Sequence, residues 1–269
     1  MAQEKKSSGI PAFAGIVIIV AVIVGYLIYY FVLGNGGNFQ DGNHDNKPLP
    51  NNFLGIMFKG GAIVPWLIVI LLIVLTFAIE RFLTIQAAKG KGSVETFVRR
   101  IRELLSNGNI NEAIAECDKQ RGSVANVLRS GLVKYGQVEG DTNLDKEAKI
   151  AAIEKALEEA TALELPMLSK NLVIMSTCAS ISTLVGLLGT VFGMIKAFAA
   201  LANAGAPDAI GLANGISEAL INTALGIGAA ALGIIFYNLF TNLIDSLTYG
   251  MDEAGFSIVQ TYSATHKER

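Results

Sequence analysis

The chain has 269 residues, of which 52% are apolar and only 16% are charged, and its mean hydropathy is +0.47. A soluble domain carries about 25% charged residues, so this composition excludes soluble and secreted proteins. The 21 Lys and Arg residues nearly balance the 23 Asp and Glu residues, which argues against nucleic acid as a partner and leaves an integral membrane protein.

The first predicted element is a membrane-spanning helix over residues 10–33, preceded by a cytoplasmic N-terminus of residues 1–9. The helix carries no charge and exceeds the roughly 20 residues that a helix needs to cross a bilayer. A secretory signal is the competing interpretation, because Lys5 and Lys6 precede the apolar run. The apolar part of a signal has only about 7–15 residues, so the length here favours an uncleaved helix.

A polar loop and then a second membrane-spanning helix follow along the chain. Residues 34–60 are predicted as a periplasmic loop, of which residues 34–50 are rich in turn formers, and residues 61–85 are apolar. Trp66 suits the aromatic belt at one membrane interface, and Glu80 and Arg81 suit the headgroup boundary at the other. The loop ends in a segment with the spacing of a short amphipathic helix on the membrane surface, carried by Phe53, Leu54, Met57 and Phe58.

Residues 86–170 differ completely in composition and predict a polar helical region in the cytoplasm. The charge run over residues 146–159 predicts a solvated helix face rather than a binding site. Apolar residues recur at helical spacing, as in Phe97, Ile101, Leu104 and Leu105, and later in Ile150, Ile153 and Leu157.

Two further spans complete the predicted architecture. Residues 171–201 and 211–247 are joined by a short loop of residues 202–210, and residues 248–269 form a tail. Both spans exceed the minimum length, so we expect them to tilt or to protrude from the bilayer.

The distribution of basic residues predicts the orientation. The loop of residues 34–60 has only Lys47 and Lys59, and the loop of residues 202–210 has no basic residue. The basic insertion therefore lies in the cytoplasm, together with Lys5, Lys6, Lys267 and Arg269. Four crossings place both ends on this side, so the topology is self-consistent.

Hydroxyl side chains mark one face of the third span, at Ser176, Ser180, Thr183 and Thr190. In the fourth span Thr223 shares a face with small residues. One interpretation is helix packing, because hydroxyls bond back to carbonyls four residues earlier and the GxxxG pattern from Gly189 to Gly193 lets helices approach. The other interpretation is a hydroxyl-lined water path.

Glu218 is the ionisable residue placed deepest in the fourth span. Such a group normally faces protein or water. The purely structural interpretation is a protonated or interfacial glutamate that is hydrogen-bonded to Asn222. The helix repeat puts Glu218 about 140° from Thr223, so the two should not point into one lumen.

Nothing in the sequence predicts an enzyme, a cofactor or a metal site. Cys117 and Cys178 lie in unrelated contexts that do not suggest a disulfide, and His44 and His266 are isolated. No acid–base or nucleophilic constellation accompanies them.

The segments Gly186–Met194 (GLLGTVFGM) and Ile216–Ala230 (ISEALINTALGIGAA) resemble the MotA/TolQ/ExbB proton-channel family, and ExbB most of all. The Glu80–Phe82 exit and the polar helical region after it match as well. The resemblance implies an all-α, homopentameric protein of the bacterial inner membrane, with long helices that extend into the cytoplasm around a central pore. Residues 10–33 depart from the three-span pattern of ExbB.

The resemblance also implies partners and site residues. Thr190 and Thr223 match pore-lining threonines of the family, and Glu218 matches a membrane glutamate. The pore would enclose transmembrane helices of an ExbD-like partner, and proton flow would energise a TonB-like protein that spans the periplasm. Threonine hydroxyls do not titrate near neutral pH, so we expect the partner to bring an aspartate as the proton carrier and this chain to form the wall.

Three classes of function stay open from the sequence. The first is an ExbB-like motor subunit, from which a TolQ-like role or a subunit of a gliding or secretion machine cannot be separated by these motifs. The second is a non-conducting membrane scaffold. The third, a small-solute permease, is disfavoured because no inverted repeat or broken helix pair is present.

Overall fold

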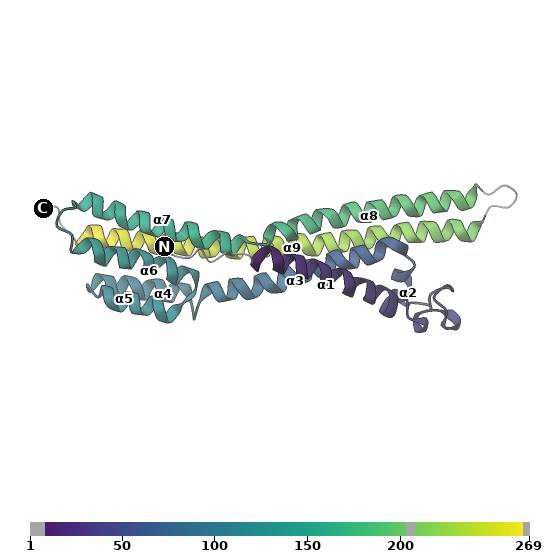
Figure 1. Cartoon of the computed structure of the whole chain (residues 1–269), viewed down its shortest axis with the longest axis horizontal. Coiled ribbons are helices and arrows are strands. Elements are labelled where there is room, and N and C mark those ends of the chain that lie inside the picture. The colour runs from purple at the N-terminus through teal and green to yellow at the C-terminus, as the bar shows by residue number, and fades with distance from the viewer. Residues whose placement is uncertain (1–8, 203–207, 266–269) are drawn as a thin grey trace. The chain divides into compact units, whose positions relative to one another are not determined.

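The computed structural model describes residues 9–202 and 208–265, with side chains from residue 13 onward. Within these ranges the chain is helical and no strand occurs, apart from one isolated bridge between Phe39 and Pro48 (Figure 1). The all-α prediction is confirmed. The α-helices are α1 (Gly9–Leu27), α2 (Phe53–Phe58), α3 (Val64–Lys89), α4 (Val94–Ser106), α5 (Ile110–Gln120), α6 (Gly122–Glu139), α7 (Lys146–Ser169), α8 (Leu172–Leu201) and α9 (Ala209–Thr265).

Four helical segments are long and apolar enough to cross a membrane, as predicted. They are Phe13–Leu33, Gly61–Ser106, Lys146–Leu201 and Ala209–Thr265. Residues 248–265, predicted as a tail, continue α9 without a break. Lys5, Lys6, His266, Lys267 and Arg269 lie outside the described residues, as does most of the loop predicted at 202–210.

The chain divides into two compact units. The membrane unit comprises Met1–Ile79 and Val173–Tyr237, and the polar unit comprises Glu80–Leu172 and Asn238–Arg269.

In the membrane unit, α1 ends in a π-helical turn, Ile28–Leu33, that packs against the start of α3. Tyr29 stacks on Phe58 of α2, with ring centroids 4.7 Å apart, and Tyr29 Oη donates to the Phe58 carbonyl. The predicted short helix is therefore present as α2, whose first turn is capped by the Asn52 side chain, and Phe53 at its start is 75% exposed. Its position on the membrane surface stays a prediction.

In the polar unit, the helical periodicity of the sequence corresponds to a buried core. Phe97, Ile101, Leu104 and Leu105 of α4 are buried, and so are Ile153 and Leu157 of α7. Gly131 of α6 lies against Leu157, and a β-carbon there would come within 2.5 Å of the leucine. The close approach of α6 and α7 therefore depends on a residue without a side chain.

Arg81 and Glu80 of α3 organise the end of α7. The Arg81 side chain is only 2% exposed and donates to the carbonyls of Met167 and Leu168, at 3.2 and 3.1 Å. Its guanidinium also pairs with Glu80, whose carboxylate accepts from Asn171 at 3.3 Å. The arginine satisfies carbonyls that the helix terminus leaves without partners, and its charge suits the negative end of the helix dipole.

Candidate functional site

The site lies on the α8–α9 pair of the membrane unit, and small residues determine how closely these helices approach. The two helices run side by side in Figure 1. A β-carbon on Gly226 would lie 2.7 Å from the Ser182 carbonyl oxygen, and one on Gly193 would lie 2.7 Å from the Gly215 carbonyl oxygen. Neither contact is tolerable, so only glycine permits this spacing.

Thr190 of α8 and Thr223 of α9 meet along one flank of this seam. Their hydroxyl groups form a hydrogen bond to each other, and both side chains are half-buried. Each hydroxyl also lies within hydrogen-bonding distance of a carbonyl of its own helix, Thr190 to Gly186 at 3.3 Å and Thr223 to Ala219 at 3.2 Å. The two hydroxyl groups have only one proton each for these three contacts, so while one threonine donates to the other, the second can donate to the carbonyl of its own helix.

The surface around the threonine pair is apolar and uncovered. Leu187, one turn before Thr190, is 53% exposed, and Ile227, one turn after Thr223, is 57% exposed. The two hydroxyls are the polar groups of this face, and each still has acceptor capacity for a polar group of another helix.

Lys196 and Glu218 form an ion pair on the opposite flank of the seam. Lys196 Nζ lies 2.6 Å from Glu218 Oε1 and 2.9 Å from Oε2. The Glu218 side chain is 13% exposed and the Lys196 side chain 58%. The turn before α3 closes over this flank, since a β-carbon on Gly61 would come within 2.5 Å of Glu218 Oε1.

The purely structural interpretation of Glu218 therefore named the wrong partner, because the carboxylate pairs with Lys196 and not with Asn222. Asn222, which is fully buried, donates instead from Nδ2 to the Gly60 carbonyl at 2.9 Å. The lysine across the seam offers the carboxylate a full opposite charge, which the amide cannot match. The sequence did not identify Lys196 as the partner of Glu218, and it assigned Asn222 to Glu218 where the structure assigns it to Gly60.

The remaining hydroxyl residues of α8 do not join the threonine pair in the structure. Ser176 and Ser180 are exposed, and Ser180 Oγ donates to the Ser176 carbonyl at 3.2 Å. Thr183 is half-buried. That these three line a proton pathway with Thr190, Thr223 and Glu218 stays a prediction.

The chemistry available here is hydrogen bonding together with one ion pair. No group of three His, Cys, Asp or Glu residues in the described ranges is placed to hold a metal ion. Two further polar atoms of the seam, Ser182 Oγ and Asn222 Oδ1, are buried and have no hydrogen-bond partner among the described residues.

The threonine pair and the glycine seam lie in a segment that a known family shares. Residues 119–253 match the model of the MotA/TolQ/ExbB proton channel family. The chain belongs to this family. That confirms the resemblance inferred from the Gly186–Met194 and Ile216–Ala230 segments.

Family members with different roles are similar to this chain. The putative biopolymer transport protein ExbB-like 3 of Synechocystis is 40% identical over 90 residues, 33% of this chain and 43% of that protein. The Tol-Pal system protein TolQ of Pseudomonas aeruginosa is 33% identical over 118 residues, 44% of this chain and 51% of that protein.

The biopolymer transport protein ExbB of Pseudomonas putida is 27% identical over 197 residues, 71% of this chain and 59% of that protein. The chain thus spans about half the length of these curated relatives. Both ExbB and TolQ names occur among them, so the comparison supports the family and not one system within it.

Proposed function

We propose that this chain is the proton-channel and stator subunit of a bacterial inner-membrane motor. Several copies, five in the arrangement that the family resemblance implies, would surround transmembrane helices of an ExbD-type partner. The observation that carries the proposal is the hydrogen bond between Thr190 and Thr223 on an otherwise apolar, uncovered flank of the α8–α9 pair.

The two hydroxyls suit a wall better than a carrier. Each donates one hydrogen bond and accepts others, so the pair can solvate a carboxylate when it is ionised and when it is protonated. A partner aspartate beside Thr190 would gain and lose the proton. One charge crossing 100 mV releases about 2.3 kcal/mol, enough to bias a partner helix between two orientations.

Glu218 has a different role in this proposal. Its carboxylate is paired with Lys196 on the flank that faces the turn before α3. The pair anchors the α8–α9 hairpin to that turn and keeps a nearly buried charge neutralised.

The polar unit would lie in the cytoplasm with both chain ends, and the energised partner would be a TonB-like protein. A TolQ-like role in a Tol-Pal system is the second candidate, favoured by the similarity to TolQ of Pseudomonas aeruginosa. Co-purification with one system or the other discriminates between them.

Proton flux in proteoliposomes that hold the complex with its partner tests the proposal. Thr190→Val with Thr223→Val keeps side-chain shape and removes both hydroxyls. We expect at least a tenfold fall in flux, about 1.4 kcal/mol on the barrier. Thr190→Ser with Thr223→Ser restores the hydroxyls and should recover most of the flux. Unchanged flux in a normally assembled valine variant would refute the channel and favour a scaffold.

A further inference from the structure

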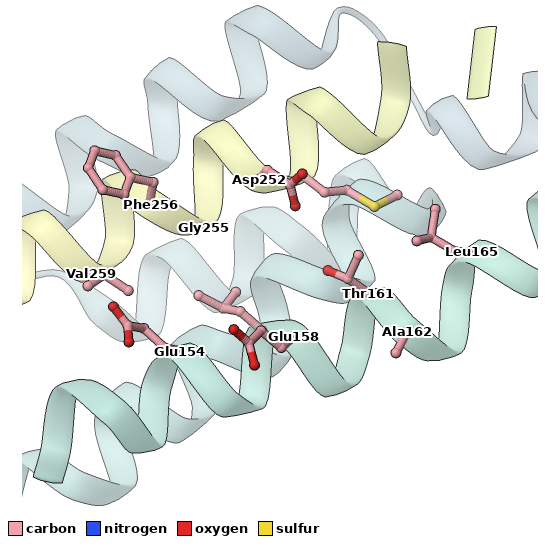
Figure 2. A pocket seen from close by; sticks show the side chains of 11 residues that line it. Glu154, Glu158, Thr161, Ala162, Leu165, Asp252, Gly255, Phe256 and Val259 are labelled. Atoms are coloured by element: carbon pink, nitrogen blue, oxygen red, sulfur yellow. The ribbon is translucent and has the colours of Figure 1, made fainter. Parts of the chain in front are cut away.

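An open groove of about 460 Å³ lies between α7 and the end of α9 in the polar unit (Figure 2). Glu154 and Glu158 stand on the α7 wall, and Asp252, Phe256 and Val259 stand on the α9 wall. The groove is lined in full by Glu154, Leu157, Glu158, Thr161, Ala162, Leu165, Met251, Asp252, Gly255, Phe256 and Val259.

The floor of the groove is apolar. Leu157 and Met251 are 7% and 1% exposed, and both also belong to the core. Phe256 on the wall is 64% exposed, although its helix has buried positions on the side that packs against the core. A large aromatic side chain left open beside an apolar groove marks a surface that another chain can cover.

The rim carries three carboxylates without a cation. Glu154, Glu158 and Asp252 are exposed and form no ion pair or hydrogen bond within the described ranges. Their neighbours differ, because Glu159 on the next face of α7 pairs with Lys155 at 3.9 Å. Like charges four residues apart on a helix repel each other, so a cationic ligand would relieve this arrangement.

We propose that the groove binds a short amphipathic segment of another protein, with an apolar stripe flanked by lysine or arginine. The stripe would cover Leu157, Phe256 and Val259, and the cations would face the three carboxylates. The α7 wall from Glu154 to Leu165 runs about 16 Å, which matches three turns of a bound helix. The sequence alone assigns the charge run of residues 146–159 to solvent, whereas in this proposal one side of the run faces the bound segment.

The arginine-bearing helix α4 of a second copy fits the groove less well than an amphipathic segment does. This helix supplies exposed arginines at Arg99, Arg100 and Arg102, but its other exposed residues, Glu95, Thr96, Glu103 and Ser106, are polar. The helix therefore offers the rim its charges and offers the apolar floor nothing.

The test uses the full chain in nanodiscs of phosphatidylcholine, which carries no net charge to attract a cationic peptide. The probe is a fluorescent peptide of about 12 residues. It contains leucine on one helical face and lysine on the other, and its affinity is measured by anisotropy at low salt. A peptide with glutamate in place of lysine is the control, and we expect only the lysine peptide to bind.

Variants separate the groove from general surface charge. Glu154→Gln, Glu158→Gln and Asp252→Asn together should weaken binding about tenfold, because exposed ion pairs are individually weak and three are lost. Phe256→Ala should weaken it about fivefold through lost apolar contact. The matched control, Glu103→Gln with Glu112→Gln and Glu147→Gln, removes three exposed carboxylates elsewhere and should leave binding unchanged. Equal loss in the rim and control variants, or no binding to the unmodified chain, overturns the proposal.

A cysteine at Ala162 tests whether a second copy already fills the groove. In a chain with Cys117→Ala and Cys178→Ala, Ala162→Cys should react with a bulky maleimide as fast as Thr96→Cys on exposed α4. Protection at Ala162 with cross-links between copies would assign the groove to the homo-oligomer and reject the partner segment. Neither result depends on Thr190 or Thr223, so the groove and the proton pathway succeed or fail separately.

Discussion

Lys196 Nζ and Glu218 Oε1 lie 2.6 Å apart across the α8–α9 seam, on the flank opposite the hydrogen-bonded pair of Thr190 and Thr223. The two flanks of one helix pair therefore carry different chemistry. One holds a charge pair beneath the turn before α3, and the other presents hydroxyls to whatever covers the hairpin.

Breaking the ion pair tests its anchoring role. Glu218→Gln leaves the lysine without its counterion, and we expect the folded chain to lose about 1 kcal/mol, a modest value because Lys196 is more than half exposed. Adding Lys196→Gln removes the unpaired charge and should recover part of the loss. Thermal unfolding in detergent measures both. If the double variant lost as much stability as Glu218→Gln and Lys196→Gln lose in sum, the two residues would not interact.

Close packing of α8 on α9 predicts a sharp difference between two neighbouring glycines. Gly226→Ala drives a methyl group to 2.7 Å from the Ser182 carbonyl and should destabilise the hairpin by about 1–3 kcal/mol. Gly228 has open space on the same helix, so Gly228→Ala should be neutral or slightly stabilising. Denaturant unfolding of the two variants checks this, and similar stabilities would contradict the seam.

In the polar unit, Gly122 makes a backbone contact that no other residue allows. Its φ is +85°, and a β-carbon there would lie 2.4 Å from the Ala88 carbonyl oxygen. Gly92, with a φ of +88° and open space, is the matched control. Both alanine variants suffer backbone strain of about 1–2 kcal/mol, and Gly122→Ala should lose about 1–3 kcal/mol more from the clash. Equal losses of unfolding free energy in the two variants would show that the positive φ alone, and not the clash, causes the loss.

Burial raises the pKa of the Cys117 thiol to about 12. The pKa of a cysteine thiol in an unfolded chain is about 8.5, so the folded state holds the proton more tightly. The stability that this contributes is complete below about pH 8.5 and is lost as pH rises toward about 12. We expect the unfolding free energy of the unmodified chain to fall more steeply over this window than that of Cys117→Ala. Parallel curves would contradict the shift.

The burial of Cys117 also predicts how its thiol reacts with maleimide. With Cys178→Ala in place, the remaining thiol should resist maleimide at pH 8 in the folded chain and react in denaturant, because the thiolate is the reactive form and burial suppresses it. Rapid labelling of the folded chain would show that α5 opens readily.

Much of this architecture could be predicted from the sequence. The apolar runs predicted four spans, and the spacing of Phe97, Ile101 and Leu105 predicted a buried face. Both signals are local, since span length and helical period follow from a single helix. The continuation of α9 to Thr265 is less visible, because its last turns mix polar and apolar residues without a clear boundary.

The partners of the site residues depend on register between helices, which periodicity alone does not give. The sequence placed Glu218 and Thr223 on different faces of the helix, and the structure agrees. It did not connect Glu218 to Lys196. An antiparallel hairpin that sets Gly186 against Gly226 also brings these two charges together, so the glycine pattern held a usable signal.

The most direct test of the proposed wall is disulfide trapping in the complex purified with its partner. In a chain without native cysteines, Thr190→Cys is combined with a cysteine in place of the partner's transmembrane aspartate, and Phe192→Cys is the control, since that exposed side chain points about 160° away around α8. We expect rapid trapping at Thr190 and little at Phe192. Trapping at Phe192 alone, or at neither position in an intact complex, would contradict a threonine-lined path for the proton.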